Sequence, residues 1–226
     1  GIMAGEPLYA FPNSTDEYLR VPGNKLKMVN GSYVLQFTTE LWETPYLDKI
    51  GLKVIDHPNK MDVYIDEAFT PPPFPSSKIY GVKEKYIPTK AMDSQGNDLI
   101  KKLKKRDNIY VSNLYHDLYQ GVTEFHDLVL EFENINSDDS LFLFLQGWLF
   151  PTDASINVNL SHSENLRSIF PYLQIPNENG TWETIIDNLG FPKGKNKTMI
   201  VDLTNRFNNH DYRIRLRTNM QIYWDH

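Results

Sequence analysis

The longest apolar run in the chain covers residues 141–149. Apolar side chains occupy both parities of positions 141–145, so the run lacks the alternation of a half-exposed strand and predicts a strand buried on both faces. Pro151 lies just beyond its end. The run is too short for a transmembrane helix, which needs about 20 apolar residues. Its aromatic side chains favour a strand over a helix. We therefore predict the central strand of a β-sandwich and no membrane span.

Period-two alternation of apolar and polar residues predicts the other strands. They are expected at residues 32–38, 46–56, 61–65, 79–87, 126–132, 155–160, 198–203, 212–217 and 220–226. The strand at 126–132 and the apolar run follow one another across a turn, so we expect them to be antiparallel neighbours. One short helix, capped by Asp98, is expected over residues 99–106, where Leu99, Ile100 and Leu103 share a face.

Nine or ten strands, one short helix and no alternation of strands with helices favour an all-β fold. We predict an antiparallel two-sheet β-sandwich, jelly-roll-like in topology. The proline-rich residues 1–24 are expected to form an irregular lead-in segment, and residues 25–226 are expected to form a single β-sandwich domain. A chain of 226 residues is long enough for one large β domain with a core.

Charge and cysteine content exclude several classes of function. The formal net charge of −6 disfavours nucleic acid as a partner, because that affinity depends on neutralising phosphates with Lys and Arg. The basic cluster at residues 101–106 is simplest to interpret as a solvated helix face. The chain has no cysteine, which rules out disulfides, thiolate metal sites and cysteine nucleophiles.

A few side chains stand out as candidate binding residues. Asp153, Asn157 and Asn159 follow the central run and carry oxygen ligands of the kind that calcium prefers. Their spacing is not that of an EF-hand loop and lacks a bidentate Glu, so capping a turn is the simpler prediction, with no cofactor. Trp148 and Trp182 are candidates for stacking against sugar rings.

Catalytic motifs do not stand out. The sequence contains neither a Gly-x-Ser-x-Gly elbow nor a Gly-x-x-x-x-Gly-Lys loop, and no two histidines have the i, i+4 spacing of a helical zinc site. A pair of carboxylates for glycoside hydrolysis can still come together in space, since sequence spacing does not reveal which acidic residues face each other. Whether the chain is an enzyme stays open at this point, and we assign no catalytic residue.

Six separate blocks of sequence resemble one known protein family. They are ELWETPYLD (40–48), VIDHP (54–58), PPPFP (71–75), GWLFPTDASIN (147–157), GFPKGKNKT (190–198) and IYWD (222–225). They are similar to the region that follows the FG-GAP propeller and the ASPIC/UnbV segment in large bacterial proteins related to cartilage acidic protein. The resemblance implies an exported protein, extracellular or periplasmic. It assigns no catalytic residues here, and this chain lacks the propeller that carries the family's calcium-type loops.

Two functional hypotheses follow. The first is a non-catalytic binding or interaction module of a larger exported protein, whose partner is a glycan or another domain of that protein. The second is a carboxylate-based hydrolase, glycosidase-like, with a cleft in the sandwich. A cleft with two facing carboxylates, or a carboxylate beside a buried His with a shifted pKa, would favour the enzyme, and a smooth surface with an aromatic patch would favour the binding module.

Overall fold

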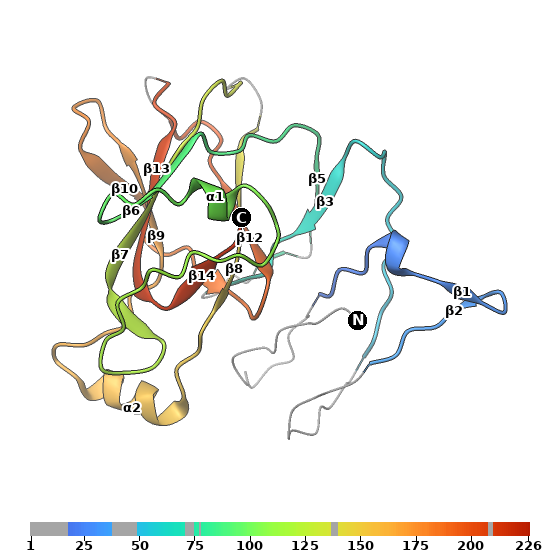
Figure 1. Cartoon of the computed structure of the whole chain (residues 1–226), viewed down its shortest axis with the longest axis horizontal. Helices are drawn as coiled ribbons and strands as arrows, with labels where there is room; N and C mark the ends of the chain where they lie inside the picture. Colours follow the sequence, from blue (N-terminus) through green and yellow to red (C-terminus); the bar gives the residue numbers. More distant parts are fainter. Residues whose placement is uncertain (1–17, 38–48, 71–74, 77, 137–139, 208–209) are drawn as a thin grey trace.

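Antiparallel β-sheets make up most of the molecule. The computed structural model describes residues 18–37, 49–70, 75–76, 78–136, 140–207 and 210–226. Within these residues fourteen strands form five antiparallel sheets, so the predicted all-β fold is confirmed (Figure 1). The largest sheet has the order β10-β9-β13-β7-β6, with bounds Trp182–Ile186, Tyr172–Pro176, Arg213–Met220, Val122–Glu131 and Lys90–Asp93. A three-stranded sheet has the order β12-β8-β14, with bounds Lys197–Asp202, Phe142–Leu149 and Ile222–Trp224.

Three two-stranded sheets complete the strands. They pair β1 (Met28–Val29) with β2 (Ser32–Tyr33), β3 (Asp62–Ile65) with β5 (Ile79–Val82), and β4 (Ala68–Phe69) with β11 (Phe191–Pro192). Helical structure is limited to the 3₁₀ turn η1 (Gly23–Lys25) and the helices α1 (Ile100–Leu103) and α2 (Ala154–His162) among the residues described.

The hydrophobic core lies between the two larger sheets. On β13, Ile214 and Leu216 are buried, while the arginines that alternate with them are only partly buried, as the amphipathic pattern predicts. On β8, Leu143, Leu145 and Leu149 are buried and join the side chains of β13 in one core cluster. The inner faces of both sheets thus supply the core, which is the arrangement of a sandwich.

Strand β8 is central to its own sheet, as predicted, but not all of its side chains are buried. Its odd-numbered leucines face the core, while Phe142, Phe144 and Trp148 on the other face are only partly buried. The β3–β5 hairpin covers part of this outer face: Tyr64 packs on Phe144, with ring centroids 4.8 Å apart, and Tyr80 packs edge-on against Phe142 at 5.5 Å. The run is apolar at odd and even positions because one face of β8 packs on the core and the other face lies under an aromatic layer.

The prediction that the strand at 126–132 pairs with the apolar run is wrong. That strand is part of β7, which lies between β13 and β6, whereas β8 lies between β12 and β14. Residues 132–141 separate β7 from β8, and tight hairpins use only about 2–5 residues. A connection of this length lets the chain cross from one sheet to the other.

The predicted strand at residues 155–160 is also wrong, because this segment forms helix α2. Asp153 is the N-cap residue, and its Oδ1 accepts hydrogen bonds from the Ile156 N–H at 2.8 Å and from the Ser155 hydroxyl at 2.6 Å. Such a cap satisfies a backbone donor that the first helical turn leaves free. The local capping signal prevails over the period-two pattern, and the prediction of a single helix misses α2.

Helix α1 is shorter than predicted. The carboxylate of Asp98 accepts a hydrogen bond from the Ile100 N–H at 2.9 Å, as expected of a capping residue, but the helix ends at Leu103. Leu99 and Leu103 are buried in the core, while the following basic residues 104–106 are exposed. The helix therefore anchors a loop that continues to β7.

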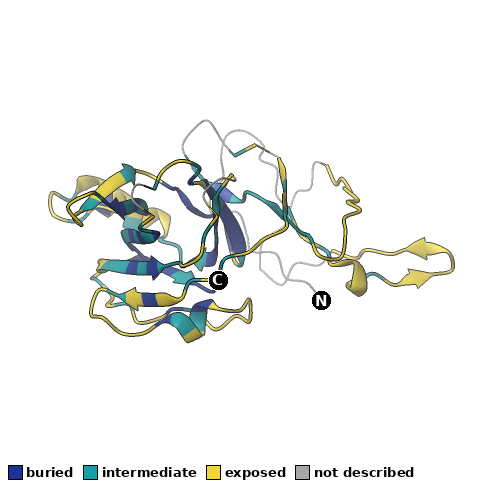
Figure 2. Cartoon of the chain, turned by 90° about the horizontal axis from the view of Figure 1, so that it is seen from above, coloured by how far each residue is buried: buried dark blue, intermediate teal, exposed yellow. Residues whose placement is uncertain are grey.

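The N-terminal part forms an arm that extends away from the sandwich. Figure 2 shows the β1–β2 hairpin at the far end of the molecule, with exposed residues throughout. The predicted strand at 32–38 is limited to Ser32–Tyr33, and residues 49–56 of the second predicted strand are not in a strand. Residues 38 and 46–48 of these predictions lie outside the described residues.

Acidic side chains satisfy the free edge of β12. The Asp66 carboxylate accepts from the Ile200 N–H, and the Glu67 carboxylate accepts from the Thr198 N–H, both at 3.1 Å. Burial raises the pKa of Asp66, and its backbone hydrogen bonds oppose that rise. The backbone N–H groups of Thr198 and Ile200 on the free edge of β12 are therefore paired without a further strand. No described helix is long and apolar enough to cross a membrane.

Candidate functional site

Four aromatic rings gather at one end of the outer face of the three-stranded sheet. Trp148 of β8 lies opposite Tyr223 of β14 in the strand pairing. Their rings stack with centroids 4.8 Å apart and an angle of 21° between the planes. Phe150 and Tyr110 meet the Trp148 ring edge-on at 5.8 and 6.1 Å. The sheet thus presents a compact, partly exposed aromatic surface on the face away from the core.

A small amide and hydroxyl network borders these rings. The Tyr110 hydroxyl donates to Asn196 Oδ1 at 2.6 Å, and Asn196 Nδ2 donates to Asn108 Oδ1 at 3.1 Å. Both asparagines have left-handed backbones, with φ of 63° at Asn108 and 57° at Asn196. This conformation costs energy for most residues and is tolerated best by Gly, Asn and Asp. Asparagine therefore suits both positions, and the hydrogen bond between the two side chains joins the loops that carry them.

A β-bulge sets the polar side chains beside Trp148. Asp225 and His226 both donate their N–H groups to the Gln146 carbonyl, at 2.8 and 3.2 Å, and the Gln146 N–H donates to the His226 carbonyl at 2.7 Å. Two residues just beyond β14 therefore oppose one residue of β8. Such bulges re-aim side chains at the end of a pairing. Here the bulge follows directly after the Trp148–Tyr223 pair.

Three polar atoms around this bulge are buried and have no hydrogen-bond partner among the described residues: Gln146 Oε1, Trp148 Nε1 and Asp225 Oδ2. Gln146 is 8 % exposed and Asp225 is 1 % exposed. Leaving such a group unpaired costs about 1–3 kcal/mol, so native proteins usually satisfy them with water or a ligand. Burial raises the pKa of Asp225, although a backbone hydrogen bond from the Asp107 N–H opposes that rise.

Cationic side chains lie over the aromatic rings of this face. The Lys195 ammonium is 5.6 Å from the centre of the Trp148 ring, and the Arg106 guanidinium is 5.6 Å from that of Tyr64. The Arg106 side chain is exposed, but partial desolvation of its guanidinium, which lies near Tyr64, Arg20 and Asp225, lowers the pKa of Arg106. We define the Trp148 site by the residues that border the ring pair: Asn108, Tyr110, Gln146, Trp148, Lys195, Asn196, Tyr223 and Asp225.

Of the residues predicted from the sequence, only Trp148 belongs to this site. Asp153, Asn157 and Asn159 are exposed and belong to α2 or its cap; Asp153 caps the helix and Asn157 Oδ1 accepts from the Thr152 hydroxyl at 2.6 Å. No cluster of three His, Asp or Glu side chains suited to a metal ion occurs among the described residues. The side chains of Asp153 and Asn157 thus take part in hydrogen bonds at the start of α2.

Trp182 lies elsewhere, on β10 at the edge of the five-stranded sheet. The Arg215 guanidinium covers its ring at 4.8 Å from the ring centre, and Arg213 lies at 6.0 Å. Arg215 also donates to Gln174 Oε1 at 2.7 Å. Because an arginine already occupies its ring, Trp182 is a weaker candidate for sugar stacking than its place in the sequence indicates.

Sequence reasoning missed most of the Trp148 site. Gln146 is the single polar side chain within the apolar run 141–149, and this was a signal that could have identified it. Asn108 follows Asp107 in a turn-type pair, and Asn196 follows Gly194-Lys195, but neither pattern shows that the two side chains meet. Their contact depends on segments 88 residues apart.

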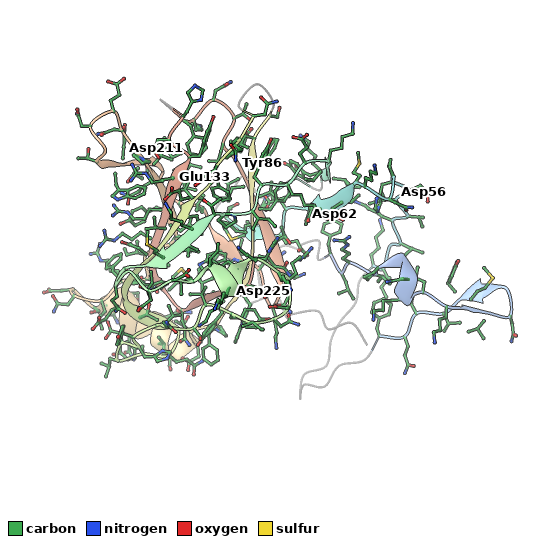
Figure 3. All side chains as sticks on the ribbon, turned by 45° about the horizontal axis from the view of Figure 1, so that its top comes forward. Asp56, Asp62, Tyr86, Glu133, Asp211 and Asp225 are labelled. Carbon is green, nitrogen blue, oxygen red and sulfur yellow. The ribbon has the colours of Figure 1, made fainter. Side chains whose placement is uncertain are left out.

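A separate pocket of about 560 Å³ contains several carboxylates, including Glu131, Glu133 and Asp211. Figure 3 shows Glu133 and Asp211 away from Asp225. Arg213 binds both oxygens of Asp211, at 2.8 and 2.6 Å, and these bonds hold the pKa of Asp211 below its usual value. Glycoside hydrolysis needs one carboxyl group that stays protonated. Asp211 does not meet that requirement and cannot serve as that acid.

Comparison with known proteins adds no family assignment: no family model, curated protein or solved structure matches this chain.

Proposed function

We propose that this chain is a non-catalytic binding module that recognises carbohydrate at the Trp148 site. The observation that carries the proposal is the combination, on one sheet face, of the stacked Trp148–Tyr223 pair with three polar atoms that have no hydrogen-bond partner in the described part of the chain. Sugars combine apolar C–H patches with hydroxyls that both donate and accept. A partly exposed aromatic pair beside unpaired donors and acceptors complements those two features.

The polar groups of the site include both hydrogen-bond donors and acceptors. The indole N–H of Trp148 and the Lys195 ammonium donate, while Gln146 Oε1 and Asp225 Oδ2 accept. The unpaired atoms of Gln146, Trp148 and Asp225 are buried, so sugar hydroxyls would reach them through bridging waters. Lys195 is exposed and its flexible stem can move aside from the Trp148 ring as a sugar stacks there.

The wider context of the module rests on the resemblance described above. On that basis we propose that it belongs to a larger exported protein and works in an extracellular or periplasmic setting. A surface module that binds glycan without cleaving it would hold such a protein on a polysaccharide.

A glycan array with the purified chain tests the proposal, followed by titration calorimetry with the best oligosaccharide. We compare wild type with Lys195→Ala, which changes only an exposed side chain, and with Trp148→Ala. Trp→Ala changes at binding hot spots cost about 2 kcal/mol or more, which corresponds to roughly a 30-fold loss of affinity. We expect such a loss for Trp148→Ala and a smaller one for Lys195→Ala.

Trp182→Ala serves as the matched control, because it removes a partly exposed tryptophan on a different sheet. It should leave affinity unchanged. Trp148→Phe keeps an aromatic ring but removes the indole N–H. It therefore tests what the N–H contributes to binding without the loss of packing that alanine causes. Circular dichroism of each variant confirms that it folds. Loss of binding in Trp182→Ala, with normal binding in folded Trp148→Ala and Trp148→Phe, would refute the proposed site.

A further inference from the structure

The arm carries the sequence pattern of two strands that the structure does not pair. Tyr33, Leu35 and Phe37 alternate with other residues, and Ile50, Leu52 and Val54 do the same. Their exposed fractions lie between 41 and 79 %. Alternation of this kind is typical of strands with one face buried in a sheet. Only Tyr33 belongs to a strand here, so the apolar face that the pattern implies has no cover.

An exposed apolar surface of this size usually marks an interaction site. The period of two in the arm sequence favours a protein sheet over lipid as the partner. An extended strand has unpaired backbone N–H and C=O groups, which are costly in hydrocarbon but are satisfied by the edge of a sheet. The partner should therefore offer a free strand edge.

The sandwich itself has such an edge at β10. This strand pairs only with β9 and lies at the end of the five-stranded sheet in the described part of the chain. Edge strands often carry lysine or proline, which discourage added strands. β10 carries neither, and exposed Glu178, Glu183 and Asp187 lie on it or next to it. No Lys or Arg occurs from residue 177 to residue 192.

The arm has the opposite charge. Its described residues 18–37 and 49–60 contain Arg20, Lys25, Lys27, Lys49, Lys53 and Lys60 against the single acid Asp56. With Glu40, Glu43 and Asp48 of the intervening residues, six basic and four acidic side chains leave a net charge of +2 over residues 18–60. A basic segment with strand patterning thus complements an acidic free edge.

Arm and edge do not meet within one molecule. Figure 1 shows the β1–β2 hairpin and β10 at opposite ends of the molecule. We propose that the arm of one copy docks on the β10 edge of a second copy by strand addition. Such a contact joins two different surfaces, and it closes into a dimer when each copy gives its arm to the other.

Sedimentation velocity and light scattering over a concentration series test this proposal on the full chain. We expect wild type to pass from monomer to dimer as concentration rises. Leu52→Asp places a charge on the exposed apolar face of the arm and should abolish the dimer. Because Leu52 is exposed, the thermal melt of this variant should match that of wild type at concentrations where wild type is monomeric.

A charge exchange identifies the β10 edge as the docking surface. Glu183→Lys with Asp187→Lys should weaken dimerisation by on the order of tenfold or more, since like charges then face each other. Adding Lys27→Glu and Lys49→Glu to the same chain should restore it. Glu124→Lys with Glu133→Lys makes the same change of charge on exposed acids away from β10 and should have no effect.

Two results would overturn the proposal. One is a wild-type chain that stays monomeric up to its solubility limit, including the case in which its arm instead binds vesicles that contain phosphatidylserine. The other is a dimer that depends on Leu52 but responds equally to the β10 charge change and to the control change.

Discussion

The outer aromatic layer of β8 allows a direct test of how the sandwich is built. Leu145 faces the core and is 3 % exposed, so Leu145→Ala should lower the free energy of unfolding by about 2–5 kcal/mol. Its neighbour Phe144 faces the other way and is partly buried against Tyr64. A fully buried Phe→Ala change costs about 3–5 kcal/mol, and an aromatic pair adds about 0.5–1.5 kcal/mol to burial alone. Allowing for partial exposure, we expect about 2–3 kcal/mol for Phe144→Ala.

Urea unfolding followed by circular dichroism measures both variants. Each should shift the midpoint and leave the m-value unchanged, because the surface exposed on unfolding stays nearly the same. Phe125→Ala is the control, since Phe125 is 50 % exposed, and it should cost less than about 1 kcal/mol. A double-mutant cycle of Phe144 with Tyr64 should show coupling. A loss of less than about 0.5 kcal/mol for Phe144→Ala would mean that the β3–β5 hairpin does not cover β8, and the reasoning would fail.

Three further predictions concern single positions. Gly147→Ala should destabilise the chain, because a Cβ there would lie 2.5 Å from the Tyr223 carbonyl oxygen of β14; a melting temperature equal to that of wild type would contradict this close approach. Asp153→Ala should lower the melting temperature equally with and without calcium, since Asp153 caps α2, and a calcium-dependent rise in wild type alone would instead indicate a metal site. Burial lowers the pKa of His126, so the folded state binds its proton less readily than the unfolded chain, where His titrates near 6.5. Stability should therefore fall as pH decreases through that range, and denaturation over a pH series should show a smaller slope in His126→Gln.

The sequence predicted the fold class well because the core depends on patterns that are local. The apolar run became β8, and the alternation of Ile214 and Leu216 with arginines became β13. The errors occurred where a second influence competed with the pattern. At residues 155–160 the Asp153 cap favours a helix, and in the arm the alternation has no sheet to join within the described part of the chain.

The candidate site was harder to predict because its parts come from distant segments. Trp148 was identified because a flat aromatic ring can stack on a sugar ring, but Tyr110, Asn196 and Asp225 meet it only through sheet register and the bulge at Gln146. Sequence spacing contains no information on which strands become neighbours across a sandwich. The failure to anticipate that β7 and β8 lie in different sheets has the same physical origin.

The most direct test of the account is whether a bound sugar lies at Trp148. The chain has four tryptophans, and each gives one indole N–H signal in a ¹⁵N–¹H NMR spectrum, which substitution of each tryptophan assigns. Trp148 Nε1 has no acceptor within the residues that the structure describes, so its signal should shift strongly when the chain is titrated with the oligosaccharide selected on the glycan array. The signal of Trp182 should stay in place. A sugar that binds and shifts Trp182 but leaves Trp148 unchanged would contradict the account.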